Sequence, residues 1–421
     1  MERCEVCKKK IISIALTFSL LFPTTVFASA DPNLIGTSAI SVDLKTKEII
    51  YAKNIDEKRQ PASITKLMTA LLFAENKKPE DSIVYPEAAK TQPDYSYGLN
   101  VHPVKAGETF TGKDAMDILL LYSGNDIAYM IAESVGGNQN NFMNMMNKKA
   151  KDLNMTNTNF VTPNGLDDNT NDHYTTAYDL SLLGEAAYNN EWVKSTMDKK
   201  TSEVKSSNGP IATVENRNKL LGINGNIGGK TGYTTKSGRC LVSLYERDGR
   251  GIVTVVLNSE YNFPEDTKVF EDMEKLADYS FNAEKQVYLE KNKEVQTVTL
   301  KYKAIPFIGP TRTIKVPIAL HKDITLYNNG LTPELNYSIS DFSAWSLNPN
   351  KSVGKVDVKV RDYSESYELY PNISRVQLIK DNAIYYALAT LVLIIFISLV
   401  IIISIKMKSG KRRRRKKSIF K

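Results

Sequence analysis

The sequence predicts an antiparallel β-sheet covered by helices, with a helical lobe inserted, then a separate all-β segment and one membrane-spanning helix. Three observations support this class. Strand-like runs enclose a helical middle between residues 38 and 282, apolar residues alternate with period two from 286, and Ala383–Ile405 contains no charge. The 421 residues exceed one ordinary domain, and 42% hydrophobic with 24% charged residues exclude wholesale disorder.

The first elements are a hairpin and a helix. Ser38–Asp43 and Glu48–Lys53 are short β-prone runs separated by a turn. Pro61 then precedes a segment whose apolar residues recur at helical spacing. The middle, 113–190, is predicted to be mainly helical, over Ala115–Tyr122, Asp126–Val135, Asn140–Leu153 and Thr176–Ala187.

Strands return after residue 210. Arg239–Glu246 and Gly251–Asn258 flank Asp248-Gly249, which is a strong hairpin turn signal. Pro264–Asn282 has an apolar face at helical spacing and is expected to cover the sheet. We expect these elements to form one domain, 31–285.

Residues 286–370 alternate with period two and contain Pro and Asn turns, which predicts an all-β domain. It carries no catalytic motif, so we expect a spacer or a platform for partners. A short polar linker, 371–382, is expected to follow.

The N-terminus has the pattern of a signal peptide, 1–30. Lys8-Lys9-Lys10 precedes the apolar run Ile11–Phe22 and the small residues Ala28-Ser29-Ala30. We expect cleavage after Ala30. A retained membrane anchor is disfavoured, because the apolar run is shorter than the roughly 20 residues that a span needs. The Cys4-x-x-Cys7 motif lies in the removed segment, so the mature chain keeps only Cys240 and forms no internal disulfide.

The C-terminus predicts a single-pass anchor. The 23 uncharged residues of Ala383–Ile405 can cross a bilayer. The tail 406–421 holds ten Lys or Arg and no acid, so it should remain cytoplasmic, which places residues 31–382 outside the cell membrane. The formal charge is +8 for the chain but −4 for residues 31–405, which excludes nucleic acid as a partner of the external part.

Ser63-Ile64-Thr65-Lys66 is an S-x-x-K motif. On a helix the two polar side chains share a face, so the lysine amine can take the serine proton and activate a nucleophile. Copies at 202–205, 352–355 and 418–421 lack an apolar helix behind the serine. The three histidines, at 102, 173 and 321, show no ligand spacing, and we expect no metal or other cofactor.

Two further motifs follow in order. Ser123-Gly124-Asn125 is an S-x-N in a break between helical runs, where the flanking helices would hold it rigidly. Lys230-Thr231-Gly232 is a K-T-G at the start of a strand, where an amine and a hydroxyl can hold a carboxylate. Its glycine lets another backbone approach closely.

The ordered set S-x-x-K, S-x-N and K-T-G resembles the penicillin-recognising serine enzymes, and most closely the low-molecular-mass penicillin-binding proteins that act as D-alanyl-D-alanine carboxypeptidases. The resemblance covers about 31–282. It implies an α/β (α+β) fold, with an antiparallel sheet, covering helices and a helical subdomain, followed by a β-sandwich. It also implies peptidoglycan stem peptides ending in D-Ala-D-Ala as substrates and β-lactam antibiotics as inhibitors.

The resemblance also implies roles for single residues. Ser63 would attack the carbonyl between the terminal D-alanines, Lys66 would be the base, and Ser123 would relay a proton to the leaving D-alanine. Asn125 would hold the peptide amide, and Lys230 and Thr231, with Gly232 beside them, would bind the terminal carboxylate. The N–H groups of Ser63 and Tyr233 would form the oxyanion hole.

Other functions remain open at this stage. The same chemistry serves β-lactamases and transpeptidases, although no deacylating Glu can be identified. A non-catalytic β-lactam sensor or cell-wall-binding protein is the third alternative. His173 is expected to be structural, and Arg239 could contact the substrate carboxylate or only stabilise its hairpin.

Overall fold

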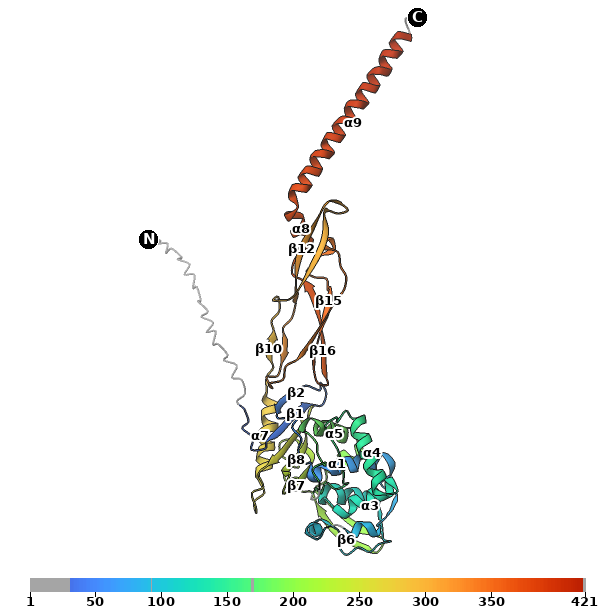
Figure 1. Cartoon of the computed structure of the whole chain (residues 1–421), viewed down its shortest axis with the longest axis vertical. Coiled ribbons are helices and arrows are strands. Elements are labelled where there is room, and N and C mark those ends of the chain that lie inside the picture. Colours follow the sequence, from blue (N-terminus) through green and yellow to red (C-terminus); the bar gives the residue numbers. More distant parts are fainter. Residues whose placement is uncertain (1–30, 92, 168–169, 419–421) are drawn as a thin grey trace, which may run out of the picture.

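The computed structural model describes residues 31–91, 93–167 and 170–418, so the predicted signal peptide lies outside the described residues. The molecule is elongated (Figure 1). A helix-covered sheet occupies one end, the strands of the C-terminal segment lie in the middle, and one long helix forms the other end.

The central sheet has the strand order β2-β1-β9-β8-β7, and all its pairs are antiparallel. Its strands are β1 (Ser38–Asp43), β2 (Ile49–Lys53), β7 (Asn226–Thr234), β8 (Gly238–Arg247) and β9 (Arg250–Ser259). The predicted hairpins are confirmed. The inner residues of β8 and β9 are almost all buried, because both faces of the sheet are covered.

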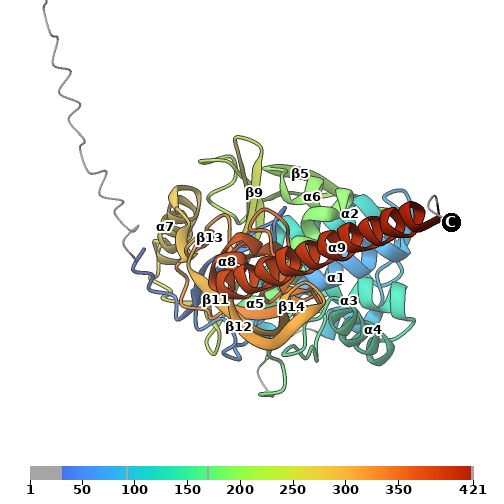
Figure 2. The same ribbon diagram turned by 90° about the horizontal axis from the view of Figure 1, so that it is seen from above.

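Alternate residues of β8 pack into two hydrophobic cores, one on each face of the sheet. Val242 and Leu244 join the apolar cluster of the helical lobe, whereas Leu241 and Tyr245 pack with α7 (Lys268–Asn282) on the opposite face. Figure 2 shows α7 on the other side of the molecule from α1, α3 and α4. The helix α7 begins at Lys268, later than the predicted Pro264, because Asn262, Glu265 and Asp266 form turns before it.

The helical lobe matches the predicted helical middle. Its elements are η1 (Ala62–Ile64), α1 (Thr65–Asn76), η2 (Glu87–Thr91), η3 (Asp94–Leu99), α2 (Gly112–Asp117), the π-helical turn η4 (Ile118–Tyr122), α3 (Asn125–Gly136), α4 (Gln139–Asp152), α5 (Ala177–Asn189) and α6 (Glu191–Met197). Two short antiparallel pairs flank it: β3 (Ser82–Val84) with β4 (Thr109–Thr111), and the hairpin of β5 (Thr201–Ser206) and β6 (Gly209–Glu215).

The C-terminal segment is all-β, as predicted. A sheet of order β11-β12-β16-β15-β14 lies beside the pair β10-β13, and Val316, Ile318 and Val356 are among its buried residues. The bounds are β10 (Gln286–Leu289), β11 (Glu294–Ile305), β12 (Ile308–Leu320), β13 (Ile324–Leu326), β14 (Glu334–Ile339), η5 (Ala344–Ser346), β15 (Gly354–Val360) and β16 (Tyr363–Pro371).

The expected polar linker, 371–382, is not simply extended. It contains the helix α8 (Arg375–Asp381), whose Leu378 is buried in the core of the β-segment. The helix α9 (Ala383–Ser418) follows, and its stretch Ala383–Gly410 is long and apolar enough to cross a membrane.

Candidate active site

Ser63 and Lys66 lie where η1 leads into α1. The Nζ atom of Lys66 is 2.9 Å from the Oγ atom of Ser63. The same amine donates to Oδ1 of Asn125 and to the backbone carbonyl of Asn164, each over 2.8 Å. Lys66 is fully buried, so its amine has these protein groups in place of water.

Burial lowers the pKa of Lys66 well below its usual value, and the charges of Lys230 and Arg217 lower it further, while Asp126 opposes them. A neutral amine has two N–H donors and one lone pair. Asn125 and Asn164 accept the two donors, which leaves the lone pair for the Ser63 hydroxyl. The geometry therefore suits a base, as in the S-x-x-K hypothesis.

Ser123 follows the π-helical turn η4 and precedes α3. Its φ of 73° is left-handed, a conformation that non-glycine residues seldom adopt. Its Oγ atom accepts a hydrogen bond from Nζ of Lys230 over 3.0 Å. Nδ2 of the neighbouring Asn125 is buried and has no hydrogen-bond partner among the described residues. A donor of this kind suits a carbonyl of a bound peptide.

The K-T-G motif lies in β7 and approaches the serine turn. Lys230 is buried and also donates to the Thr231 carbonyl over 3.0 Å, and burial together with the charges of Arg217 and Arg239 lowers its pKa. At Gly232 a Cβ atom would lie 3.1 Å from the backbone nitrogen of Ser63, so a side chain there would crowd the turn. This is the close approach that the sequence predicts.

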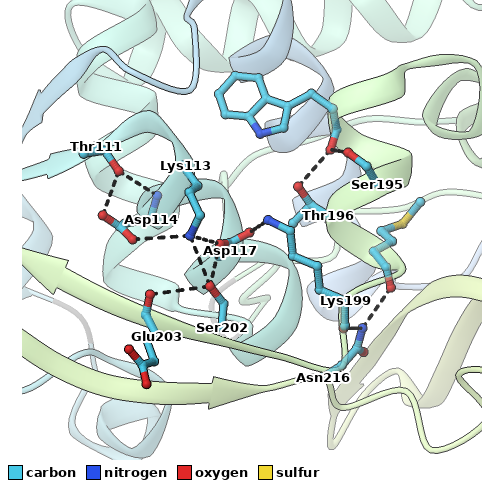
Figure 3. Close-up of polar contacts among 12 residues, drawn as sticks. Thr111, Lys113, Asp114, Asp117, Ser195, Thr196, Lys199, Ser202, Glu203 and Asn216 are labelled. Carbon is cyan, nitrogen blue, oxygen red and sulfur yellow. Dashed lines mark hydrogen bonds and ion pairs between the residues drawn. The ribbon is translucent and has the colours of Figure 1, made fainter.

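A network of ion pairs and hydrogen bonds surrounds the buried carboxylate of Asp117, a few residues before the S-x-N loop (Figure 3). Asp117, at the end of α2, accepts from Lys113 over 2.8 Å and from Lys199 over 2.6 Å, and its carboxylate also accepts from the Ser202 hydroxyl over 2.8 Å. These contacts join α2 to β5 and to the loop after α6. Because η4 and Ser123 follow α2 directly, the network fixes the start of the loop.

Every predicted site residue comes from one of three elements that meet at this point: Ser63 and Lys66 from η1 and α1; Ser123 and Asn125 from the loop before α3 and its first turn; and Lys230, Thr231, Gly232 and Tyr233 from β7. Tyr233 is the outermost, at 41% exposed, and its ring lies 4.4 Å from that of Tyr261.

Arg217 and Asn164 are the residues that sequence reasoning missed. Arg217 follows β6, lines an open cavity of about 560 Å³ with Tyr122 and Arg239, and places its charge near both lysines. Asn164 contributes a backbone carbonyl, which no side-chain motif can indicate. Both lie within residues 31–282, the part of the sequence that resembles the family, and this is the only signal that the sequence offers for them.

The structure also shows the contacts of His173 and Arg239, whose roles the sequence leaves open. His173 is buried, accepts from Val161 N–H at Nδ1 and lies 2.9 Å from Thr65 Oγ1 at Nε2, so it stabilises the start of α1. Arg239 forms an ion pair with Asp266, and its guanidinium lies over the ring of Tyr261.

The comparisons with known proteins agree with this geometry. Residues 25–261, more than half the chain, match the peptidase S11 family, described as D-alanyl-D-alanine carboxypeptidase. The chain therefore belongs to this family, and it is a serine-type carboxypeptidase of the penicillin-binding class.

Three relatives illustrate the similarity. The D-alanyl-D-alanine carboxypeptidase DacF of Bacillus subtilis is 26% identical over 324 residues, covering 75% of this chain and 82% of DacF. A mutant of the Streptomyces K15 DD-transpeptidase superimposes with a TM-score of 0.54 at 26% identity, over 60% of this chain and 99% of that one. The carboxypeptidase DacD of Francisella tularensis has a TM-score of 0.58 at 24% identity, over 82% of this chain and 95% of that one, and shows the fold alone.

Proposed function

We propose that the chain removes the terminal D-alanine from peptidoglycan stem pentapeptides through an acyl-enzyme on Ser63, and that β-lactams acylate the same serine. The observation that carries this proposal is the 2.9 Å contact between Ser63 Oγ and the buried amine of Lys66. Lys66 takes the hydroxyl proton, Ser63 Oγ bonds to the scissile carbonyl carbon, and the bond to the terminal D-alanine nitrogen breaks.

The remaining residues act on the substrate or on the leaving group. Ser123, held by Lys230, relays to the departing amine the proton that Lys66 took from Ser63. The unpaired Nδ2 of Asn125 holds a carbonyl of the stem peptide. Thr231, with the charge of Lys230 behind it, binds the terminal carboxylate, and Gly232 allows β7 to lie close to Ser63. The N–H groups of Ser63 and Tyr233 form the oxyanion hole. Water then releases the shortened peptide.

We also propose the topology of a single-pass membrane protein. The helix α9 crosses the cell membrane, residues 31–382 lie outside and the basic tail 406–421 lies in the cytoplasm. The apolar stretch Ala383–Gly410 and the ten basic residues of the tail support this orientation.

Release of D-alanine from a synthetic pentapeptide tests the reaction. Wild type should release it, and Ser63→Ala should lose both release and labelling by fluorescent penicillin. Ser352→Ala, which alters another S-x-x-K copy in the β-segment, is the matched control and should keep both. Release by Ser63→Ala would refute the role of Ser63. Transfer of the acyl group to an added amine, instead of water, would favour a transpeptidase, the activity named for the K15 relative.

A further inference from the structure

The hairpin of β11 and β12 ends in an exposed apolar tip. Phe307 is 97% exposed and Ile308 is 69% exposed; Phe307 has the largest value among the described large apolar residues, α9 included. Both lie beside Pro306 and Gly309 in a tight turn. An aromatic ring and a branched chain held in water at the end of a long hairpin indicate a surface that is covered in use.

This hairpin is attached to the base of α9. Nη1 of Arg312 donates to Oδ1 of Asn382 over 2.8 Å and to the carbonyl of Asp381 over 3.0 Å. Its guanidinium lies over the ring of Tyr385. Nδ2 of Asn382 donates to the hydroxyl of Tyr302 over 3.0 Å, and Tyr302 is the register partner of Arg312. Both strands are thus fixed to the junction of α8 and α9.

The tip lies beside the start of the apolar span. Figure 1 shows the end of the hairpin at the level of the base of α9, on the side toward which α9 leans. Tyr385 and Tyr386 occupy that base, and tyrosines of a span favour the interface between lipid and water. The strands continue past the Tyr302–Arg312 pair for about four residues, roughly 13 Å, before the turn.

Two basic side chains of β11 lie beside the tip. Lys301 and Lys303 are exposed on β11, and with Phe307 and Trp345 they line an open cavity of about 370 Å³. Trp345 is fixed there, because its Nε1 donates to the Lys303 carbonyl over 3.0 Å. An apolar tip with lysines and a tryptophan behind it matches the layers of a lipid surface, from acyl chains to anionic headgroups.

We propose that this hairpin tip is a second membrane contact, in which Phe307 and Ile308 enter the outer leaflet while Lys301 and Lys303 contact anionic headgroups. The inference rests on the proposed topology, since α9 brings the tip to the bilayer. Two contacts, the span and the tip, fix the tilt of the external part, which one helix alone cannot do.

Depth-dependent quenching in the full chain tests the proposal. The mature chain, with Cys240 replaced by Ala, is reconstituted in vesicles of phosphatidylcholine and phosphatidylglycerol that contain a lipid with a quencher high on its acyl chain. An environment-sensitive fluorophore is attached at one of three positions: Ile308→Cys at the tip, Leu388→Cys in the span, or Val84→Cys in the helical lobe. We expect at least two-fold quenching at 308 and 388 and none at 84.

The outcomes separate the two proposals. Quenching at 388 but not at 308 overturns the tip contact and leaves the span intact. Absence of quenching at both positions overturns the span, and the tip contact with it. Lys301→Glu with Lys303→Glu should reduce quenching at 308 at least two-fold in vesicles that contain phosphatidylglycerol. Lys359→Glu, an exposed lysine at the other end of the β-segment, should not, and equal effects of the two changes would contradict a headgroup contact.

Discussion

Lys66 and Lys230 are both buried at the centre of the site, and neither forms an ion pair with a carboxylate among the described residues. Two unpaired ammonium groups in one buried site would be costly. Burial lowers the pKa of each lysine, and the charge of Lys230 lowers the pKa of Lys66 further. Arg217 adds to this effect on each lysine. The lowered pKa thus allows Lys66 to act as the base, so the site needs no histidine for this role.

Removing the charge of Arg217 should change the pH profile. In Arg217→Gln the repulsion is relieved, so the pKa of Lys66 rises and the base is protonated at higher pH. The acidic limb of kcat/KM for D-alanine release should therefore move to higher pH. Arg247→Gln, whose charge pairs with Asp278 and does not act on either lysine, should leave the limb in place. A shift of that limb to lower pH in Arg217→Gln would contradict the account.

His173 makes a separate prediction about stability. Burial lowers its pKa from 6.5 to about 4, so the unfolded chain binds a proton that the folded chain rejects. The stability that the neutral His173 contributes is fully present above pH 6.5. It is lost as the pH falls toward 4, and the loss in the free energy of unfolding reaches about 3 kcal/mol. Asp126, whose pKa burial raises to about 6, acts with the opposite sign in this range.

The difference between wild type and His173→Gln isolates the histidine. Chemical unfolding of both chains at several pH values should show wild type losing its advantage between pH 6.5 and 4. A difference in the free energy of unfolding that does not change with pH would show that His173 is charged, or exposed, in the folded state.

The sequence predicts the residues whose side chains define a motif, and the family resemblance adds the N–H groups of Ser63 and Tyr233. Neither identifies a backbone carbonyl outside the motifs or a charge that acts over a long range. Ser63, Ser123 and Lys230 are identified because their types and order are diagnostic. Arg217 acts on the lysines by charge alone, and Asn164 acts by its carbonyl. Neither function requires a particular spacing, so only the folded chain brings them to the site.

At the scale of elements, the turns that carry the two serines are both unusual. Ala62, before Ser63, has a φ of 47°, and Ser123 has a φ of 73°. Left-handed conformations at non-glycine residues persist only when the surroundings enforce them. Around Ala62 the enforcing contact is Gly165, where a Cβ atom would lie 1.8 Å from the Ala62 carbonyl oxygen.

Gly165→Ala should therefore harm both stability and acylation. Gly137→Ala is the matched control, since Gly137 also has a positive φ but a Cβ there meets no atom within 4 Å. The control should cost roughly 1–2 kcal/mol from backbone strain. Gly165→Ala should cost roughly 1–3 kcal/mol more, from overpacking, and slow acylation by penicillin. Equal unfolding free energies for the two variants would contradict the contact.

Periodicity predicts most elements well and their ends less well. The hairpin of β8 and β9 has a turn signal and alternating cores, and its predicted bounds agree with the structure almost to the residue. The helix α8 is missed, because its polar composition resembles a linker and only Leu378 is buried. Its position depends on the β-segment against which it packs, which local sequence does not reveal.

At the scale of the molecule, the catalytic end and α9 lie at opposite ends of the long axis (Figure 1). The β-segment joins them. It contacts the edge strand β2, where Asn329 donates to the Ile49 carbonyl, and the turn after β2, where Arg361 pairs with Asp56. A covered edge strand is protected from pairing with other chains. This arrangement fits a spacer that holds the site away from the membrane.

Deleting residues 286–370 while keeping the tether tests the spacer. Activity on a soluble pentapeptide should remain within a few-fold of wild type, because no catalytic side chain lies in the segment. Activity on intact cell walls in cells should fall, since the site is brought to the membrane. Complete loss on soluble peptide, in a variant that still binds fluorescent penicillin, would show that the segment contributes to substrate binding.

Ser63 is proposed as the nucleophile, activated by Lys66. Mass spectrometry of the penicillin adduct tests it most directly, because tryptic cleavage after Arg59 and Lys66 releases a peptide, Gln60–Lys66, whose sole serine is Ser63. We predict the added penicilloyl mass on Ser63 in that peptide, and no adduct in Ser63→Ala. An adduct on Ser123 or on any other residue would contradict the account.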